Sequence, residues 1–551
     1  MSELKFIVIS GTTGVTENCY IYQWQEEMMV VDCGVGFPDP EMLGVDLVIP
    51  DFTYIKKNKD KLRGILISHG HEDHLGALPF LFRDVDVPIY ATKLVAGFIE
   101  DKFADYGLKP PRITVFNPER DAFAVGVFKI NPFRVSHSVP DGVGYAIDTP
   151  AGRVFHVPDY KFDWTPVDGR PFDIARAAML ASGGVLALAS DSLGSTTEGY
   201  TKSEKEIETK VETIARDAKK KILFTTISSN ISRIKQALNV AAKLRRKVVI
   251  VGRSIEKKVE IAQRLGYLDF DKHLLILPKE AKRFRDSQLF FIISGSYGQI
   301  GSALYRVAIS DHQFIRVSED DVVIFSGDPA PPGSKDNVDF VVDRLIELGV
   351  DVHYYDTQED LHVSGHGSRE DINTLFGLVR PKYFIPIGGT IRHNKAYKRM
   401  AMDFGANEHS VFELKGGNIL ELGENGAFVL PEKIPSRSVM VDGLGVGDVG
   451  NIVLRDRSVL ATDGVAIAVI ELNKDTKKLS NTPDIISRGF VYKGAKESLL
   501  KDAGFALKAE LERMKELDQK LARNVAADFL ERYFNKKIAR RPMILPVIVE
   551  V

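Results

Sequence analysis

Residues 64–77 read GILISHGHEDHLGA, an apolar run followed at once by three histidines, a glutamate and an aspartate. The run is typical of a buried strand, and the apolar residues after the motif indicate a helix. His69 and His71 lie two positions apart on an extended segment, so their side chains project to the same side and can bind one ion. Asp73 and His74 lie on the turn into the helix and would suit a second ion nearby.

A metal ion needs more ligands than this motif supplies. His137 in RVSHSVPDG and Asp159 in FHVPDYKFD stand at loop-like strand ends and are the chain's further candidates. A carboxylate such as Asp159 can bridge two cations. Glu72, between the two pairs, is expected to face away, and His156, inside an apolar strand, is expected to be a core histidine. A solvated polar loop is the alternative interpretation of the motif, but four ligand-type residues in this order after a strand favour metal binding.

Size and composition place the chain among globular proteins. Its 551 residues predict roughly three or four compact units. The start runs directly into a strand-like pattern without the features of a signal peptide, and no apolar run is long enough to cross a bilayer. Cys19 and Cys33 form no CxxC pair, which indicates a reducing cytoplasm and buried thiols rather than a zinc finger. The net charge of −2 means that any nucleic-acid binding must use local basic surface.

The pattern of elements changes near residue 203. Short strands and turns dominate before it, whereas helices and strands then alternate to about residue 355, which is typical of a parallel α/β unit. Ser203 is the expected N-cap of the first of these helices. Short strands return at 360–425. The remaining segments are a polar, proline-bearing linker (430–438), a strand-rich stretch from 439, a long charged helical stretch (495–533) and a final strand.

Longer stretches carry a family resemblance. HGHEDHLGA with Asp32 in VVDCG, His137 and Asp159 is similar to the motif set of the metallo-β-lactamase fold. Five further stretches together resemble ribonuclease J, a member of the β-CASP group of nucleases, and the agreement covers nearly the whole chain. These stretches are FPDPEMLGVDLVIPDFTYI (37–55), DYKFDWTPVDG (159–169), HVSGHGSREDI (362–372), VDGLGVGDVGNIVLRDR (441–457) and PDIISRGFVY (483–492).

The resemblance implies an α/β architecture, in which a β-CASP α/β domain is inserted into a metallo-β-lactamase αββα sandwich and a small α+β domain follows. The expected boundaries are 1–202 and 359–429 for the two parts of the sandwich, 203–358 for the β-CASP domain, 430–440 for a linker and 441–551 for the C-terminal domain.

The resemblance also implies a function. It predicts a metal-dependent ribonuclease with 5′→3′ exonuclease and endonuclease activity in RNA maturation and decay, which hydrolyses phosphodiesters by metal-bound hydroxide. The implied cofactor is Zn²⁺ or Mn²⁺, at one or two ions per chain. The implied partners are 5′-monophosphorylated RNA and further subunits, in a homodimer, a homotetramer or a complex with a paralogous subunit. A cytoplasmic protein without membrane contact is expected.

Roles for single residues follow from the same resemblance. His69, His71 and His137 would bind one ion, Asp73 and His74 the other, and Asp159 would bridge. Asp73, Asp191 and His366 would be catalytic, with the Asp–His pair suited to donating a proton to the leaving group. Asp32 and His393 would support the ligands from behind. The expected substrate-binding residues are Ser229, Asn230, Ile231, His362, Val363, Ser364, Gly365 and His366. Without the resemblance, Asp191 and the 228–233 stretch could equally be helix caps.

One of several departures from the family pattern falls on a metal ligand. The stretch PIGGTIRH (386–393) has Gly388 where the family has a histidine ligand of the second ion, and losing an imidazole should weaken that site. Two hypotheses therefore stand side by side: an active ribonuclease, and a weakly active or inactive paralogue that serves as a partner subunit or RNA-binding scaffold. A third reading, a hydrolase of small esters or thioesters, is disfavoured by the inserted and C-terminal domains.

Overall fold

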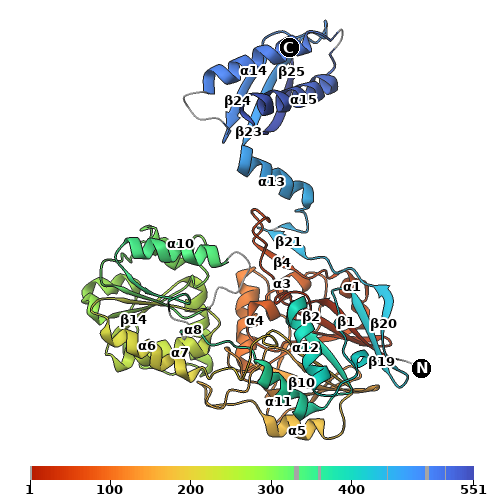
Figure 1. Cartoon of the computed structure of the whole chain (residues 1–551), viewed down its shortest axis with the longest axis vertical. Coiled ribbons are helices and arrows are strands. Elements are labelled where there is room, and N and C mark those ends of the chain that lie inside the picture. The colour runs from red at the N-terminus through yellow and green to blue at the C-terminus, as the bar shows by residue number, and fades with distance from the viewer. Residues whose placement is uncertain (1–2, 328–333, 358–360, 444, 491–495, 515–516) are drawn as a thin grey trace. The chain divides into compact units, whose positions relative to one another are not determined.

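The computed structural model describes residues 3–327, 334–357, 361–443, 445–490, 496–514 and 517–551. The chain divides into two compact units, the first formed by Met1–Phe37 and Leu47–Val439, the second by Pro38–Asp46 and Met440–Val551 (Figure 1). Among the described residues, no helix combines the length and the apolar character that spanning a bilayer requires.

Two β-sheets form the centre of the first unit. The larger has the order β20-β19-β1-β2-β3-β5-β6-β7, and the smaller has the order β18-β12-β11-β10-β9-β8. The strands of the larger sheet are β1 (Leu4–Ser10), β2 (Cys19–Trp24), β3 (Glu27–Val31), β5 (Leu62–Leu66), β6 (Ile89–Ala91), β7 (Ile113–Val115), β19 (Asn418–Gly423) and β20 (Gly426–Lys433); a short strand, β4 (Leu47–Ile49), lies outside it. Those of the smaller sheet are β8 (Phe123–Val125), β9 (Phe128–Arg134), β10 (Val143–Thr149), β11 (Gly152–Val157), β12 (Ala187–Asp191) and β18 (Tyr383–Ile387).

The two sheets pack face to face because alternate residues of their strands are apolar. Phe6 and Val8 of β1 share one buried cluster with Tyr145 and Ile147 of β10 and with Ala189 of β12. Helices cover the outer faces, so the predicted αββα sandwich is confirmed. On the larger sheet's side lie α1 (Thr53–Lys57), α2 (Glu72–Leu75), α3 (Leu78–Leu81) and α4 (Lys93–Asp105).

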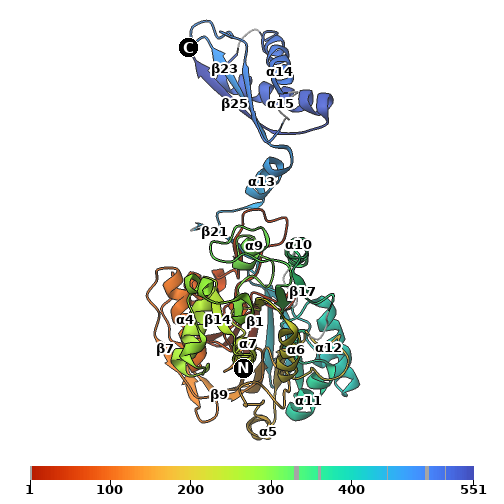
Figure 2. The same cartoon turned by 90° about the vertical axis from the view of Figure 1, so that its left-hand side faces the viewer.

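Three helices pack on the outer face of the smaller sheet (Figure 2). Leu180, Leu375 and Tyr397 are buried with Phe155 and Leu188 of the sheet in a second apolar cluster. The helices are α5 (Ile174–Ala181), α11 (Arg369–Val379) and α12 (Ile391–Asp403).

A parallel α/β domain is inserted between β12 and α11. Its sheet has the order β14-β15-β13-β16-β17, with every neighbouring pair parallel. Both faces are buried, as expected for a parallel sheet covered by helices (Figure 1). The strands are β13 (Ile222–Thr225), β14 (Lys247–Val251), β15 (Leu289–Ile293), β16 (Val322–Phe325) and β17 (Asp351–His353), and the helices are α6 (Lys205–Asp217), α7 (Ile231–Lys243), α8 (Arg253–Leu265), α9 (Ala303–Ala308) and α10 (Ser334–Glu347).

The chain leaves the sandwich and returns to it at neighbouring points. Gly194, just after β12, forms an isolated parallel bridge with Ser368, just before α11. Thr201 also donates its hydroxyl to the His366 carbonyl at 2.8 Å. The insertion therefore brings Asp191 and His366, far apart in the sequence, to one edge of the smaller sheet.

The second unit is a small α+β domain. Its sheet has the order β24-β23-β25, with β23 and β25 parallel and β23 and β24 antiparallel. Two helices bury Leu507 and Leu530 against Ala468 and Ile470 of β23. The elements of this unit are β21 (Val439–Asp442), β22 (Gly445–Val446), α13 (Asn451–Asp463), β23 (Val465–Leu472), β24 (Asp484–Arg488), α14 (Lys496–Leu511), α15 (Gln519–Ile538) and β25 (Met543–Glu550).

Local details differ from the sequence-based expectations. The segment expected as a linker from residue 430 begins inside β20, which ends at Lys433. The charged stretch 495–533 contains two helices, α14 and α15. The N-cap of α6 is Glu204 rather than Ser203. The expected boundary between residues 358 and 359 falls outside the described residues.

Candidate metal centre

The histidine motif sits where β5 ends and α2 begins. Ser68 through Gly70 continue from the strand as loop, and His71 is the N-cap residue of α2. His69 and His74 are almost fully buried, which requires polar partners for their ring nitrogens. Glu72 turns away from them and pairs with Lys102 of α4 at 2.7 Å, as the sequence predicted.

The first cluster of ligand atoms comes from His69, His71, His137 and Asp159, all within 4.8 Å of one another. His71 Nδ1 lies 3.2 Å from His69 Nε2 and 3.1 Å from His137 Nε2. The Oδ2 atom of Asp159 lies 3.5 Å from His69 Nε2 and 3.6 Å from His137 Nε2. Three imidazole nitrogens and one carboxylate oxygen therefore face one point.

A second cluster shares the same aspartate. His74 Nε2 lies 3.5 Å from Asp73 Oδ2 and 3.4 Å from Asp159 Oδ1. The two carboxylate oxygens of Asp159 thus face different clusters, Oδ2 the first and Oδ1 the second. This is the arrangement expected of a carboxylate that bridges two cations.

Hydrogen bonds behind the imidazoles fix their orientation. Asp32 Oδ2 lies 2.7 Å from His74 Nδ1, and Ser68 donates its hydroxyl to the same oxygen at 2.8 Å. His137 Nδ1 donates to the Gly365 carbonyl at 2.7 Å, so its Nε2 keeps a lone pair for an ion. Partners of this kind set the tautomer of metal-binding histidines. The predicted supporting role of Asp32 has the required geometry.

The charge states of the cluster suit cation binding. Burial lowers the pKa of His69, His71 and His137, and neighbouring imidazoles lower it further, so these three rings are neutral at pH 7. Burial alone would lower the pKa of His74, but Asp159 and Asp32 raise it well above its usual value. Burial alone would raise the pKa of Asp159, but the positive rings of His74 and His366 hold it well below its usual value. Neutral imidazoles beside an ionised carboxylate are what Zn²⁺ and Mn²⁺ bind.

Asp191 and His366 form a pair at the rim of the clusters. Asp191 Oδ2 lies 2.7 Å from His366 Nδ1, and His366 Nε2 lies 3.8 Å from Asp159 Oδ2. Burial would lower the pKa of His366, but Asp191 and Asp159 raise it to about 9. His366 is therefore an imidazolium at neutral pH with its Nε2–H group facing the clusters.

Gly388 lies beside this pair. It follows β18, whose last residue is in register with Asp191 of β12. The φ angle of Gly388 is +68°, and an added Cβ would meet only the Asp191 carboxyl within 4 Å, at 3.5 Å from Oδ1, among the described residues other than its chain neighbours. An added Cβ atom would therefore fit at this position in ordinary contact with the Asp191 carboxyl.

Three segments of the chain match known family models. Residues 28–181 match the β-lactamase superfamily domain, 219–345 match the ribonuclease J β-CASP domain, and 452–551 match the ribonuclease J C-terminal domain. Ribonuclease J2 of Bacillus subtilis is 33% identical over 100% of this chain and 99% of its own. The chain belongs to the ribonuclease J family. Ribonuclease J 1 of Streptococcus pyogenes is 34% identical over 100% of this chain and 98% of its own.

A solved structure of an Enterococcus faecalis protein of unknown function shares the fold. Its TM-score is 0.55 at 13% identity, over 76% of this chain and all of that chain. The predicted fold class, a metallo-β-lactamase domain with a β-CASP insertion and a C-terminal domain, is confirmed by these matches.

The residues predicted to bind substrate in this ribonuclease J family member lie in two places. The segment from His362 to His366 passes the first cluster, and Ser364 is its exposed residue. Asn230 is the N-cap of α7, and its side-chain oxygen accepts from the Arg233 N–H at 2.9 Å. Ser229, Asn230 and Ile231 are all buried, so their substrate role stays a prediction.

His393 does not contact the ligand atoms directly. Its Nδ1 accepts from the Thr390 N–H at 3.2 Å and lies 3.1 Å from the Thr390 hydroxyl, in a capping box at the start of α12. It stabilises the helix that begins directly after Gly388 and Gly389, and any support for the centre passes through that turn. His156 is a buried core histidine, with Nδ1 3.0 Å from the Tyr22 hydroxyl, as the sequence predicted.

Asn18 is a site residue that sequence reasoning missed. Its Nδ2 lies 3.0 Å from His74 Nε2, on the side of the ring that faces the second cluster. Its Oδ1 accepts from the Tyr20 hydroxyl at 2.8 Å, which orients the amide. A lone asparagine before a strand carries no ligand pattern, so the sequence offered no signal for it.

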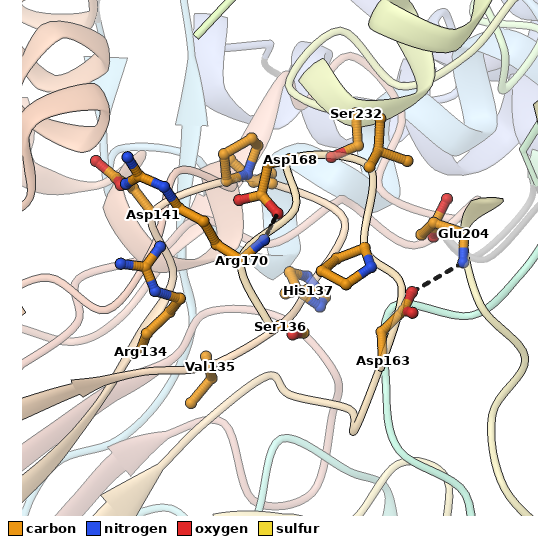
Figure 3. A pocket seen from close by; sticks show the side chains of 14 residues that line it. Arg134, Val135, Ser136, His137, Asp141, Asp163, Asp168, Arg170, Glu204 and Ser232 are labelled. Carbon is orange, nitrogen blue, oxygen red and sulfur yellow. Dashed lines mark hydrogen bonds between the residues drawn. The ribbon is translucent and has the colours of Figure 1, made fainter. Parts of the chain in front are cut away.

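A small pocket of about 10 Å³ is lined by His137 together with Asp163 and Glu204 (Figure 3). Asp163 accepts there from the Glu204 N–H at 2.9 Å. An adjoining cavity of about 570 Å³ shares several residues with it and lies between the sandwich and the inserted domain. The shared wall is formed by Arg134, Pro140, Asp141, Asp168 and Arg170.

Proposed function

We propose that this ribonuclease J family member is a metal-dependent ribonuclease that hydrolyses phosphodiester bonds of RNA. The observation that carries the proposal is the convergence of His69, His71, His137 and Asp159 on one point, with the Asp191–His366 pair in reach of the same aspartate. A small-ester hydrolase would need no inserted domain beside the centre. Retention of every first-cluster ligand favours an active enzyme over a scaffold.

The donor set fits a divalent metal ion. His69, His71, His137 and Asp159 would hold one ion, and Asp73, His74 and Asp159 a second, as Zn²⁺ or Mn²⁺. Such ions, when bound, supply Lewis-acid activation of water and neutralise charge on phosphoryl oxygens. Asp32 and the Gly365 carbonyl keep His74 and His137 turned toward the ligand positions.

His366 is suited to donate the proton that the leaving oxygen needs. Its Nδ1–H is held by Asp191, so the Nε2–H group is directed at the clusters. Its raised pKa, about 9, keeps it protonated at neutral pH. A positioned acid of this kind accelerates bond cleavage by about 10²- to 10⁴-fold.

The segment 362–366 is the proposed grip for the scissile phosphate. Ser364 is exposed, and its hydroxyl accepts from the His366 N–H at 3.1 Å, which orders the turn above the centre. We assign the substrate as 5′-monophosphorylated RNA, cut by 5′→3′ exonucleolytic and endonucleolytic cleavage. Ser229, Asn230 and Ile231 are proposed to border its path, and a cytoplasmic dimer or tetramer is the proposed working form.

Purified protein tests the proposal directly. Chelator-treated enzyme is supplied with Mn²⁺ or Zn²⁺ and given the same RNA with a 5′-monophosphate or a 5′-hydroxyl. Cleavage that requires the metal and favours the monophosphate is the expected result. The matched control is His409→Ala, which changes an exposed histidine far from the clusters in sequence. RNA binding without metal-dependent cleavage would overturn the enzyme proposal and support the scaffold.

A further inference from the structure

Lys161 is a buried lysine that stands two residues after Asp159 and has no part in the proposed chemistry. It is 1% exposed. Its Nζ donates to the Ser364 carbonyl at 3.1 Å and to the Lys202 carbonyl at 3.2 Å. A buried ammonium is retained only where hydrogen bonds and opposite charges satisfy it. The hydrogen bonds and ion pairs of Lys161 therefore show which parts of the chain it fixes in place.

The opposite charges come from both sides of the domain boundary. Asp163, on the same loop as Lys161, has Oδ2 3.7 Å from Nζ, and Glu204, at the start of the inserted domain, has Oε1 at 3.5 Å. The Glu204 N–H donates to Asp163, as Figure 3 shows. Both carboxylates are 2% exposed. The lysine thus lies in a closed ionic cluster.

Arg233 of α7 completes the cluster. Its Nε and Nη2 donate to Glu204 Oε2 at 3.2 and 2.7 Å, and its Nη1 donates to the Ser326 carbonyl at 3.0 Å. Arg233 is fully buried. Two cations and two carboxylates are therefore desolvated together with no net charge. Such a cluster defines one geometry because each group has lost its water.

The cluster is hydrogen-bonded to backbone carbonyls of the active-site segment 361–367. Ser326 donates its hydroxyl to the Leu361 carbonyl at 2.8 Å, and Lys161 holds the Ser364 carbonyl. The next carbonyl, of Gly365, is the acceptor for His137 Nδ1. A displacement at Ser364 would be passed through one peptide unit to a ligand of the first cluster.

We propose that Lys161 is a positioning residue for the segment 361–367, which ties the placement of His137 and His366 to the inserted domain through Glu204 and Arg233. The proposal rests on the proposed function only for its kinetic readout. Lys161 itself touches neither the ligand positions nor the reacting atoms. Its role is to keep the Ser364 and Gly365 carbonyls where His137 requires them.

The experiment compares two lysine substitutions. Lys161→Met removes the ammonium but leaves one cation for two buried carboxylates. The variant Lys161→Met with Glu204→Gln restores neutrality and is the form expected to fold. The matched control is Lys221→Met, which removes another buried lysine, paired with Asp321 at 3.0 Å in the inserted domain away from the segment.

Amide hydrogen exchange in metal-free protein is the first readout, because it needs neither metal nor catalysis. Peptides that cover 361–367 should exchange faster in the neutral double variant than in the unaltered chain. In Lys221→Met their exchange rate should be unchanged. The Mn²⁺ affinity and kcat should fall about 10- to 100-fold in the double variant, as for residues that orient a ligand indirectly. Both should stay within about twofold in the control.

The outcomes separate the two proposals. Unchanged exchange and unchanged Mn²⁺ affinity in the double variant would overturn the positioning role and leave Lys161 as a structural brace. Absence of cleavage by the unaltered chain would remove the proposed function, while exchange and affinity would still decide on Lys161. If Lys161→Met and the double variant both failed to fold whereas Lys221→Met folded, the same exchange measurement on Glu204→Gln would decide, with faster exchange at 361–367 expected.

Discussion

The two halves of the centre are built differently. In the first, three neutral imidazoles come from two loops, and backbone and hydroxyl groups hold all three of them from behind. In the second, Asp32 also holds His74 from behind, but among the described residues only Asp73 and His74 join the shared Asp159 in the group of ligand atoms, and Gly388 contributes no side chain. The difference predicts a tight first site and a weak second one within a single pocket.

The largest expected effect comes from breaking the complete half. His71→Ala removes the nitrogen that lies within 3.2 Å of both other imidazoles. Loss of a ligand of a Lewis-acid ion costs several kcal/mol, which corresponds to at least about a thousandfold in rate. Metal-dependent cleavage and metal content of the purified protein measure it. Asp73→Ala should be less severe, and equal losses from both changes would contradict the asymmetry.

The next largest effect is expected from the Asp191–His366 pair, which lies beside the shared Asp159. His366→Gln keeps a polar side chain but removes the acid, and cleavage should fall about 10²- to 10⁴-fold. In the unaltered chain the imidazolium is present below its pKa of about 9 and is lost as the pH rises through it. A bound cation repels the imidazolium, so the activity should decline at or somewhat below pH 9.

Rate profiles from pH 6.5 to 10.5 test this assignment. The alkaline decline should be absent from the residual activity of His366→Gln. A decline that persists unchanged in that variant would assign it to another group.

Local spacing brings together the residues of the histidine motif. His69, His71, Asp73 and His74 lie within six consecutive positions, and a strand followed by a short helix sets their relative directions. His137 and Asp159 also follow strands of one sheet, β9 and β11, and strand ends in one sheet meet at a common edge. The relative positions of these ligand residues therefore follow from their spacing along the chain and from the strands that they follow.

Contacts that depend on the insertion were not predictable in the same way. Asp191 and His366 meet because β12 pairs with β18 and Gly194 bridges to Ser368, across more than one hundred intervening residues. The sequence suggested their pairing only through family resemblance. No sequence pattern assigned a role to Lys161 or Asn18. Lys161 binds backbone carbonyls, and Asn18 contacts a single ring nitrogen, so neither role has a motif of its own. The N-cap of α6 was misplaced by one residue, although the Ser203 hydroxyl accepts from the Lys205 N–H at 3.2 Å.

A moderate effect is expected from Asp32→Asn. The amide cannot replace the charge that Asp32 places 2.7 Å from His74 Nδ1. Metal affinity of the second site should weaken about 10- to 100-fold, as is usual for a group behind a ligand. Competition titration with a coloured chelator measures both sites. Ser68→Ala, which removes only one donor to the same carboxylate, should have a smaller effect.

The smallest expected effect is a gain of metal affinity at the second site when a side chain is added at Gly388. Gly388→His would place an imidazole next to Asp191, where an added Cβ has room. The φ angle of +68° strains any residue with a side chain, at a cost of about 1 to 3 kcal/mol in stability. Gly388→Ala carries the same strain without a ligand and is the control. The histidine variant should bind the second Mn²⁺ about tenfold more tightly than the alanine variant and raise metal content from near one toward two per chain. Equal affinity in both variants would mean that the missing side chain at Gly388 does not limit metal binding at the second site. The weak binding would then have to arise from the Asn18 amide, which already occupies the metal-facing side of His74.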